Sequence, residues 1–294
     1  MLVTGAAGFV GRHAVAGLRR IHAPVRAVVR PGRPGRSPAG VEVVPIDLRA
    51  PGHHLAVALE GADAVVHAAG VRAERPWRGE TFQAAHVEAT ERLVAAAEAA
   101  GVQRFVLVSC LGAGDDAGIA LLRAKAAAEE IVRASRLEWT ILRCGLIYGP
   151  GDGRVMRLAR WMGWLGRAPI VGDGLFRVQP IAVGDVVAGC VRAATTSLLA
   201  RRVFSVAGPD VMAFRDMVEL LAAAIDRRLP PLRIPLAMAR GLTAMRVRGL
   251  VPWTADELQV MMQGFTCDPR EYFEAAGVAR PLPFSAAVRA YLGA

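Results

Sequence analysis

Short apolar runs alternate with amphipathic stretches along the first half of the chain. The apolar runs predict strands and lie at residues 1–4, 24–29, 41–46, 62–67, 104–109 and 138–143. Between them, apolar positions three and four residues apart predict helices, the clearest at residues 12–20, 79–100 and 118–135. Because strands that alternate with helices pair in parallel, the pattern predicts an α/β fold with a doubly wound parallel sheet.

The pattern becomes less regular after residue 150. We expect residues 1–150 to form the sheet domain and residues 151–294 to form a small, mostly helical C-terminal lobe, in which residues 178–206 complete the sheet. Asp185 is expected to open a helix there. A sheet of this kind binds ligands at the carboxyl ends of its strands, so we expect the cleft at that edge.

The first strand runs into a glycine-rich turn, MLVTGAAGFVG, and a helix follows at once. In this context Gly5 allows a tight turn, Gly8 lets the backbone approach a pyrophosphate, and Gly11 permits close packing of helix on strand. The helix N-terminus then offers free N–H groups to phosphate. The spacing is GxxGxxG rather than GxGxxG. We interpret the turn as the dinucleotide-binding loop of a Rossmann-type fold.

Composition excludes several classes of protein. With 53% hydrophobic and 21% charged residues, the chain is globular rather than disordered, and no apolar run approaches the length of a membrane span. Because the first strand starts at Met1, we expect no signal peptide. The four cysteines show no metal-ligand spacing, so we expect no metal site, and reduced thiols in a cytoplasmic protein.

Arginine carries almost all of the positive charge, and the net charge is +10. Lys125 is the only lysine in the chain. An ammonium is compact and has a tunable pKa, whereas a guanidinium is a rigid, permanently charged fork. The single lysine therefore marks a position where arginine would not serve.

Arg30 ends the second strand, and Arg12 directly follows the last glycine of the turn. Dinucleotide-binding folds place an acid about 20 residues beyond the glycines, where it binds the ribose 2′-hydroxyl. A guanidinium at that position would instead pair with a 2′-phosphate. The arginines therefore favour NADP(H) over NAD(H), with NAD(H) as the alternative. The plainer interpretation of Arg30 is a solvated surface arginine.

Two further segments face the same expected cleft. Asp47 follows the third strand, where it could accept a hydrogen bond from the adenine amino group or cap the next helix. The small residues Ala68, Ala69 and Gly70 follow the fourth strand and would let the chain pass over the ribose and phosphates of a cofactor.

Several motifs together carry a family resemblance: TGAAGFVG, DL after the third strand, HAAG, VLVS, AKAAAEE and RCGLIYGPGDG. Over about the first 190 residues the chain resembles an extended or atypical short-chain dehydrogenase/reductase of the NAD-dependent epimerase/dehydratase type. The C-terminal patterns WTADELQVMMQG and GVARPLPFSAAVRAYL are similar to the atypical branch that contains the nucleotide-binding accessory subunit of respiratory complex I and its bacterial relatives.

The chain departs from this family at the catalytic positions. The resemblance implies a Tyr-x-x-x-Lys pair that shares one helix face, but Leu121 stands four residues before Lys125. We therefore interpret Lys125 as an anchor for the nicotinamide ribose, with a solvated helix lysine as the alternative. The resemblance also implies a catalytic serine or threonine after the fifth strand, and either Ser109 or Cys110 could occupy that position.

The resemblance and the residues together give a predicted cofactor set. Its members are Gly5, Ala7, Gly8, Phe9, Val10, Gly11, Arg12, Arg30, Asp47, Leu48, Ala68, Ala69, Gly70, Ser109, Lys125, Cys144, Gly145, Leu146 and Ile147. Two functions fit. The first is a cofactor-holding, non-catalytic accessory subunit of NADH:quinone oxidoreductase. The second is a soluble NAD(P)H-dependent reductase or epimerase-like enzyme acting on an unknown, lipophilic substrate.

Two basic segments that contain no acidic residue indicate which partners the protein could bind. Residues 153–172 and 227–255 interleave arginine with large apolar side chains. Such a pattern suits an anionic membrane surface or a membrane protein complex, which would place a cytoplasmic protein peripherally on the inner membrane. The alternative is a helix with a solvated arginine face. No sequence motif of a nucleic-acid reader accompanies the basic charge, so nucleic acid is not an expected partner.

Overall fold

The computed structural model of the chain describes residues 1–32, 40–50, 54–114, 118–244 and 253–292. These residues form two compact units, each discontinuous along the chain. The sheet unit is built from residues 1–144, 183–206 and 270–279. The second unit is built from residues 145–182, 207–269 and 280–294. The chain therefore returns twice to the sheet unit after residue 150, at residues 183–206 and 270–279.

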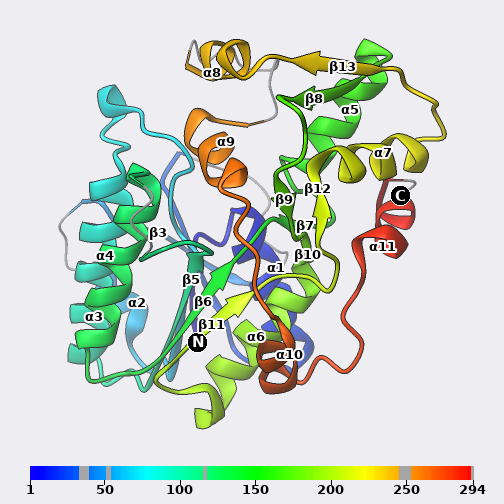
Figure 1. Cartoon of the computed structure of the whole chain (residues 1–294). Coiled ribbons are helices and arrows are strands. Elements are labelled where there is room, and N and C mark those ends of the chain that lie inside the picture. Colours follow the sequence, from blue (N-terminus) through cyan, green and yellow to red (C-terminus); the bar gives the residue numbers. More distant parts are fainter. Residues whose placement is uncertain (33–39, 51–53, 115–117, 245–252, 293–294) are drawn as a thin grey trace. The chain divides into compact units, whose positions relative to one another are not determined.

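The sheet unit contains a parallel sheet, which confirms the predicted fold class (Figure 1). Within the described residues it has seven strands. These are β1 (Leu2–Thr4), β2 (Arg26–Val29), β3 (Glu42–Pro45), β4 (Ala64–His67), β5 (Arg104–Cys110), β6 (Glu138–Cys144) and β11 (Arg202–Val206). Their order is β11-β6-β5-β4-β1-β2-β3, and every neighbouring pair is parallel.

Strand order reverses between β1 and β4. The chain leaves β1 toward β2 and β3 on one side, and then continues from β4 to β5 and β6 on the other. Thr4 at the end of β1 lies opposite both Val28 and His67, so the segments that follow these three strands emerge side by side. This is the switch point at which open α/β sheets bind ligands.

Helices cover both faces of the sheet (Figure 1). One face carries α1 (Phe9–Arg20) and α6 (Val183–Thr195), with Asp185 in the first turn of α6 and α10 (Arg270–Ala276) packed on it. The other face carries α2 (His54–Leu59), α3 (Ala89–Ala99) and α4 (Ala120–Ala134). The core on the latter face includes Leu2, Val65, Phe105 and Ile141, all with no exposed surface.

One predicted helix, at residues 79–100, starts at residue 82 and opens in a π-helical form. Residues 79–100 do not form one α-helix: a 3₁₀ turn at Pro76–Arg78 ends at Gly79, which has a φ of +62°. A π-helical stretch, Gln83–Glu88, then precedes α3. Thr81 accounts for the late start, because its hydroxyl accepts a hydrogen bond from the Ala84 N–H (3.0 Å) and so caps the new helix,.

The second unit combines helices with short strand pairs. The helices are α5 (Val155–Leu165), α7 (Phe214–Ala224), α8 (Leu236–Ala244), α9 (Ala255–Met262) and α11 (Phe284–Leu292). The strand pairs are β7 (Ile147–Tyr148) with β10 (Ile181–Ala182), β8 (Ala168–Val171) with β13 (Pro231–Ile234), and β9 (Arg177–Val178) with β12 (Met212–Ala213). Its core groups Tyr148, Phe214, Trp253 and Phe284. No helix in the described part of the chain is long and apolar enough to span a membrane.

Candidate functional site

The glycine turn leaves no room for side chains. Gly5 has a φ of +66°, and a Cβ on it would lie 2.7 Å from the backbone of Ala68. The Gly8 N–H donates to the Gly5 carbonyl oxygen (2.7 Å). A Cβ on Gly11 would lie 2.2 Å from that same oxygen. Gly5 and Gly11 are therefore required by the packing of β1, the turn and α1 against the segment that follows β4, and a Cβ on Gly8 would lie 2.9 Å from the Gly5 oxygen.

The turn delivers the N-terminus of α1 to the end of the sheet. Gly8 is the N-cap residue, and no side chain among the residues described caps this helix or places an acid in its first turn. The first N–H groups of a helix are free donors at the positive end of its dipole. They are thus available to a phosphate, and the 12-residue helix supplies a full dipole,.

A pocket of about 540 Å³ opens beside this turn, a size typical of cofactor sites. Residues of the predicted cofactor set that line it are Gly5, Ala7, Gly8, Arg30, Asp47, Leu48, Ala68, Ala69 and Gly70. Sequence reasoning missed Val28, Val29, Gly32, Ile46, Arg49, Ala85 and Ala89, which also line it. A cradle that Cβ atoms would fill, next to a pocket of this size, fits a dinucleotide.

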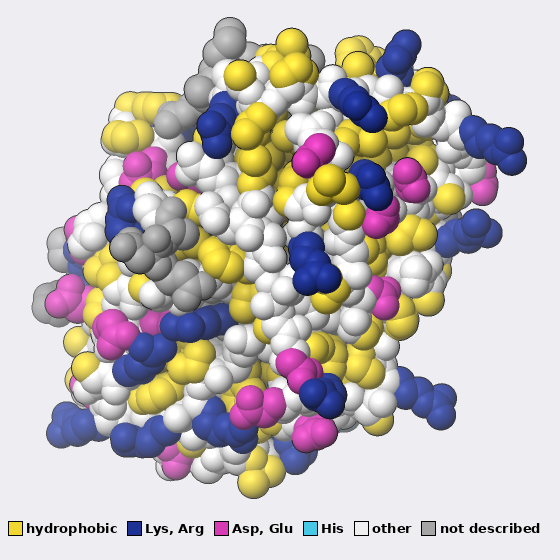
Figure 2. Space-filling model, viewed as in Figure 1, with side chains coloured by type: hydrophobic (Ala, Val, Ile, Leu, Met, Phe, Trp, Pro, Cys, Tyr) yellow, Lys and Arg dark blue, Asp and Glu magenta, His cyan; other side chains and the backbone are white. Residues whose placement is uncertain are grey.

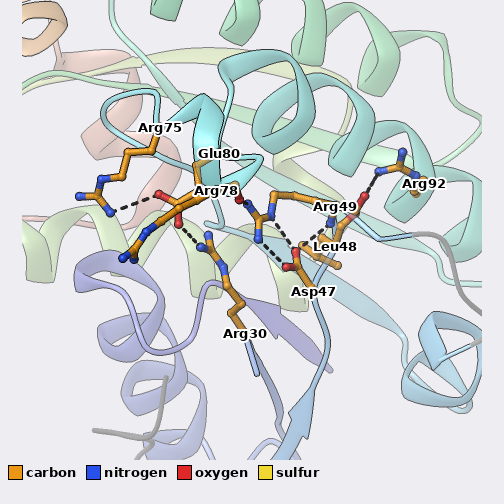
Figure 3. A network of polar contacts seen from close by, with 8 residues as sticks. All are labelled: Arg30, Asp47, Leu48, Arg49, Arg75, Arg78, Glu80 and Arg92. Atoms are coloured by element: carbon orange, nitrogen blue, oxygen red, sulfur yellow. Dashed lines mark hydrogen bonds and ion pairs between the residues drawn. The ribbon is translucent and has the colours of Figure 1, made fainter. Parts of the chain in front are cut away.

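Charged side chains form one wall of the pocket (Figure 3). Arg30 pairs with Glu80, which also binds Arg75 (3.2 Å). Asp47 binds Arg49 through two oxygens, at 2.9 and 2.6 Å. The hydrogen bond from Arg49 is the main reason that the pKa of Asp47 lies below its ordinary value. The predicted Arg30 and Asp47 thus lie on the same wall, each already held by another side chain.

A buried polar chain runs beneath the pocket floor. Thr4 Oγ1 lies 2.6 Å from His67 Nδ1, and His67 Nε2 lies 3.1 Å from Thr90 Oγ1. The Thr90 hydroxyl donates to the carbonyl of His86, whose ring contacts Gly70. Burial lowers the pKa of both histidines to about 3. Both imidazoles are therefore neutral at pH 7, and they support the segment over which a cofactor would lie.

These two histidines predict acid-sensitive folding. The unfolded chain takes up protons near pH 6.5 and the folded chain only near pH 3, so stability falls as the pH drops through that window. The expected loss is up to about 1.4 kcal/mol per pH unit for each histidine. Urea unfolding of His67→Gln between pH 7 and 4 should show a correspondingly shallower decline.

His22 offers the matched control for this experiment. It is exposed and has a φ of +58°, which asparagine also adopts. His22→Asn should leave the pH dependence of the unfolding free energy unchanged. Equal slopes in the wild type and His67→Gln would contradict the assignment of His67.

Lys125 lies near the ends of β5 and β6. Its ammonium donates to the Val108 carbonyl (3.0 Å). Burial of the ammonium lowers the pKa of Lys125, whereas the Cys110 and Cys144 thiols and the Glu129 carboxylate oppose that shift. Cys110 and Cys144 lie opposite each other in the β5–β6 register. The only lysine of the chain therefore lies beside two thiols at the carboxyl edge of the sheet.

Ser109 is directed into a different network. Its hydroxyl donates to Glu129 Oε1 (2.6 Å), and the Glu129 side chain has no exposed surface. Arg143 binds both oxygens of that carboxylate (2.7–3.0 Å), and Arg133 adds a bond of 3.1 Å. Ser109 thus helps to join β5, β6 and α4, while its neighbour Cys110 is partly exposed.

The remaining residues of the prediction do not line the pocket. The Arg12 guanidinium lies 5.5 Å from the ring centroid of Phe9, and Val10 belongs to α1 with them. Leu121 is buried on α4, one turn before Lys125. The structure assigns Gly145, Leu146 and Ile147 to the second unit.

Comparisons with known proteins agree with this site. Residues 5–160 match the family described as NAD(P)H-binding. The chain is 30% identical to mitochondrial NADH dehydrogenase (ubiquinone) 1 alpha subcomplex subunit 9 of Arabidopsis thaliana over 255 residues, which cover 83% of this chain and 62% of that protein. It is 34% identical to ceramide reductase of Caulobacter vibrioides over 199 residues, which cover 67% and 61%. The chain thus spans about three fifths of the length of these relatives.

Two further matches cover nearly the whole chain. NAD(P)H azoreductase of Xenophilus azovorans is 26% identical over 286 residues, which cover 96% of this chain and 91% of that protein. The solved structure of MoeE5 in complex with UDP-glucuronic acid and NAD superposes with a TM-score of 0.77 and 25% identity, over 99% of this chain and 97% of that one. With the glycine turn, the parallel sheet and these matches, the chain belongs to the NAD(P)H-binding, epimerase/dehydratase-like short-chain dehydrogenase/reductase family.

Proposed function

We propose that this chain binds NADP(H) in preference to NAD(H) and holds it as an accessory subunit associated with NADH:quinone oxidoreductase. The observation that carries the proposal is a retained Lys125 with a buried Leu121 one helical turn before it. Leucine has no proton to transfer. Helix α4 therefore keeps Lys125, which is suited to anchoring a ribose. It has the hydrocarbon side chain of Leu121 where the family resemblance implies a tyrosine that donates a proton.

Different pocket residues bind different portions of the cofactor. Gly5, Gly8 and the N-terminus of α1 bind the pyrophosphate, and Arg30 and Asp47 face the adenosine. A bound nicotinamide dinucleotide supplies or accepts a hydride. Because the Ser109 hydroxyl is held by Glu129, Cys110 is the side chain left to face a substrate carbonyl. A thiol is a weak hydrogen-bond donor, which supports a holding role rather than fast turnover.

The accessory-subunit role draws on the Arabidopsis relative, which is named as a subunit of NADH dehydrogenase. The basic segments support a membrane-bound partner. Arg157, Arg160 and Trp164 share the exposed face of α5, where Trp164 is 75% exposed. The other basic segment lies partly outside the described residues, at 245–252. On the face in Figure 2, however, basic side chains are interspersed with acidic and hydrophobic ones, so a complex fits better than a uniform lipid surface.

The test uses the tagged chain purified from the cells that produce it. Bound nucleotide is released and identified by mass, its exchange with isotope-labelled NADPH is timed, and copurifying proteins are identified. The proposal expects NADPH that does not exchange within hours, and subunits of NADH:quinone oxidoreductase in the eluate. Free protein that exchanges the nucleotide within seconds and oxidises added NADPH would overturn the accessory role. Recovery of NAD(H) alone, without affinity for NADPH, would overturn the cofactor preference.

A soluble NAD(P)H-dependent reductase is the second candidate. The match to the azoreductase relative covers almost the full length of both chains, and the relative named ceramide reductase supports a lipophilic substrate. In this case water, the substrate or Lys125 would supply the proton that Leu121 cannot. NADPH oxidation measured against lipophilic carbonyl substrates separates this candidate from the accessory role.

Lys125→Met should weaken NADPH binding about tenfold or more, since a hydrogen bond from a charged group contributes roughly 1.5–3 kcal/mol. Fluorescence titration of NADPH measures the change, and circular dichroism checks the fold. Arg123→Met is the matched control, because Arg123 is an exposed cation on the same helix, and its affinity should stay within twofold of wild type. Equal affinities for all three proteins would favour a purely structural lysine.

A further inference from the structure

Glu80 lies against the guanidinium of Arg30. The Glu80 side chain is only 7% exposed and pairs with Arg30 and Arg75 (Figure 3). Arg30 follows β2, whereas Glu80 belongs to the segment between β4 and α3, so two elements on opposite sides of the switch point are bridged by this pair. Arg30 also lines the pocket. A carboxylate thus already neutralises the guanidinium best placed to select between the two dinucleotides.

The backbone holds Glu80 in place. The Arg75 N–H donates to the Glu80 carbonyl (2.6 Å), and the Glu80 N–H donates to the Arg75 carbonyl (3.1 Å). Two residues beyond, the Phe82 N–H donates to Glu74 Oε1 (2.7 Å). Because Glu80 is fixed at both its main chain and its side chain, the long Arg30 side chain is the partner that can reorient.

We propose that the Glu80 carboxylate takes the place of the 2′-phosphate of NADP(H) beside Arg30. It pairs with Arg30 when the pocket is empty or holds NAD(H), and it competes with the 2′-phosphate for that guanidinium when NADP(H) binds. The inference rests on the proposed cofactor site. NAD(H) binds without disturbing the pair. NADP(H) must draw Arg30 away from Glu80 or bring a second anion beside it, and two anions that share one cation repel each other. Glu80 therefore reduces the selectivity for NADP(H) over NAD(H) that Arg30 alone would give. The carboxylate acts as a repulsive element against the 2′-phosphate.

Glutamine at position 80 removes the charge of Glu80 and little else. In Glu80→Gln the side chain keeps its shape and can still accept a hydrogen bond, so the segment should remain folded. Arg30, which lines the pocket, then loses its anionic partner, and its guanidinium becomes available to the phosphate. Guanidinium–phosphate pairs are bidentate and strong.

The experiment measures dissociation constants of NADPH and NADH for the wild type and Glu80→Gln by fluorescence titration. Calorimetry with 2′,5′-ADP and ADP repeats the comparison without the nicotinamide half. We expect Glu80→Gln to bind NADPH and 2′,5′-ADP at least tenfold more tightly, with NADH and ADP within twofold of wild type. Glu42→Gln is the matched control, because Glu42 is an exposed carboxylate paired with Arg26 on neighbouring strands, and it should change none of the four constants.

A double variant assigns the gain to Arg30. Arg30→Gln in the Glu80→Gln background should abolish most of the gain for NADPH. A gain that persists without Arg30, or equal changes for NADPH and NADH, would overturn the role of Glu80 while leaving the cofactor site intact. A wild type that prefers NADH but gains NADPH affinity in Glu80→Gln would overturn only the proposed preference. Failure of the wild type to bind either dinucleotide would overturn both.

Discussion

Gly11→Ala should reduce affinity for the dinucleotide at least about 100-fold, equivalent to roughly 2.7 kcal/mol. The added Cβ would lie 2.2 Å from the Gly5 carbonyl oxygen and 2.6 Å from its carbon. Both atoms belong to backbone, so neither can swing aside as a side chain would. Gly5 or the start of α1 must therefore move, and either movement withdraws the N–H groups that face the phosphates. Fluorescence titration of NADPH measures the loss.

Two further variants keep this prediction testable. Gly8→Ala places its Cβ 2.9 Å from the same oxygen, a milder overlap that should weaken binding less and leave the fold intact if Gly11→Ala fails to fold. Gly163→Ala is the control, since a Cβ there meets nothing within 4 Å in the last turn of α5. Alanine should leave the affinity unchanged. Wild-type affinity in Gly11→Ala would contradict the role of the turn.

The sheet could be predicted from sequence because its information is local. Each strand is a short apolar run and each helix has its own periodicity, and parallel pairing follows from their alternation. Gly5, Gly8 and Gly11 could be interpreted for the same reason, since their meaning depends only on the strand before them and the helix after them. The late start of the helix after Gly79 was missed because Thr81 caps it through a single side-chain hydrogen bond.

Partners of the site residues could not be predicted, because they are distant in sequence. Arg30 was singled out for its position after a strand, but its pairing with Glu80 spans 50 residues. Glu80 itself fell inside the predicted helix 79–100, and nothing in its neighbours marks it as a partner of Arg30. Ser109 was chosen as a catalytic candidate from its place after the fifth strand, whereas its hydroxyl is bound to a glutamate on α4. Only tertiary structure reveals which polar groups are already satisfied.

Glu129→Leu should lower the free energy of unfolding by about 3 kcal/mol, the lower end of the range for breaking a buried ion pair by removing one partner. The carboxylate accepts hydrogen bonds from Ser109, Arg133 and Arg143. Without this carboxylate, the buried Ser109 hydroxyl loses its hydrogen-bond acceptor. Arg143, whose side chain is 24% exposed, loses its anionic partner. Urea unfolding at pH 7 measures the change. Because Glu129 lies one turn beyond Lys125 on α4, NADPH affinity should fall as well.

Variants of Glu130 and Arg143 are the controls. They show whether Glu129→Leu lowers the free energy of unfolding by breaking the hydrogen-bond network of Glu129 or only by removing a negative charge. Glu130 is 70% exposed and pairs with Arg133, so Glu130→Gln should cost no more than about 1 kcal/mol. Replacing the buried pair at both ends, in Glu129→Leu with Arg143→Met, should recover much of the stability lost in Glu129→Leu alone, because no unpaired charge then remains. If the double variant is no more stable than the single one, the carboxylate does more than neutralise Arg143. Its bond to Ser109 would then be the contact that keeps β5 and Lys125 in position for the cofactor.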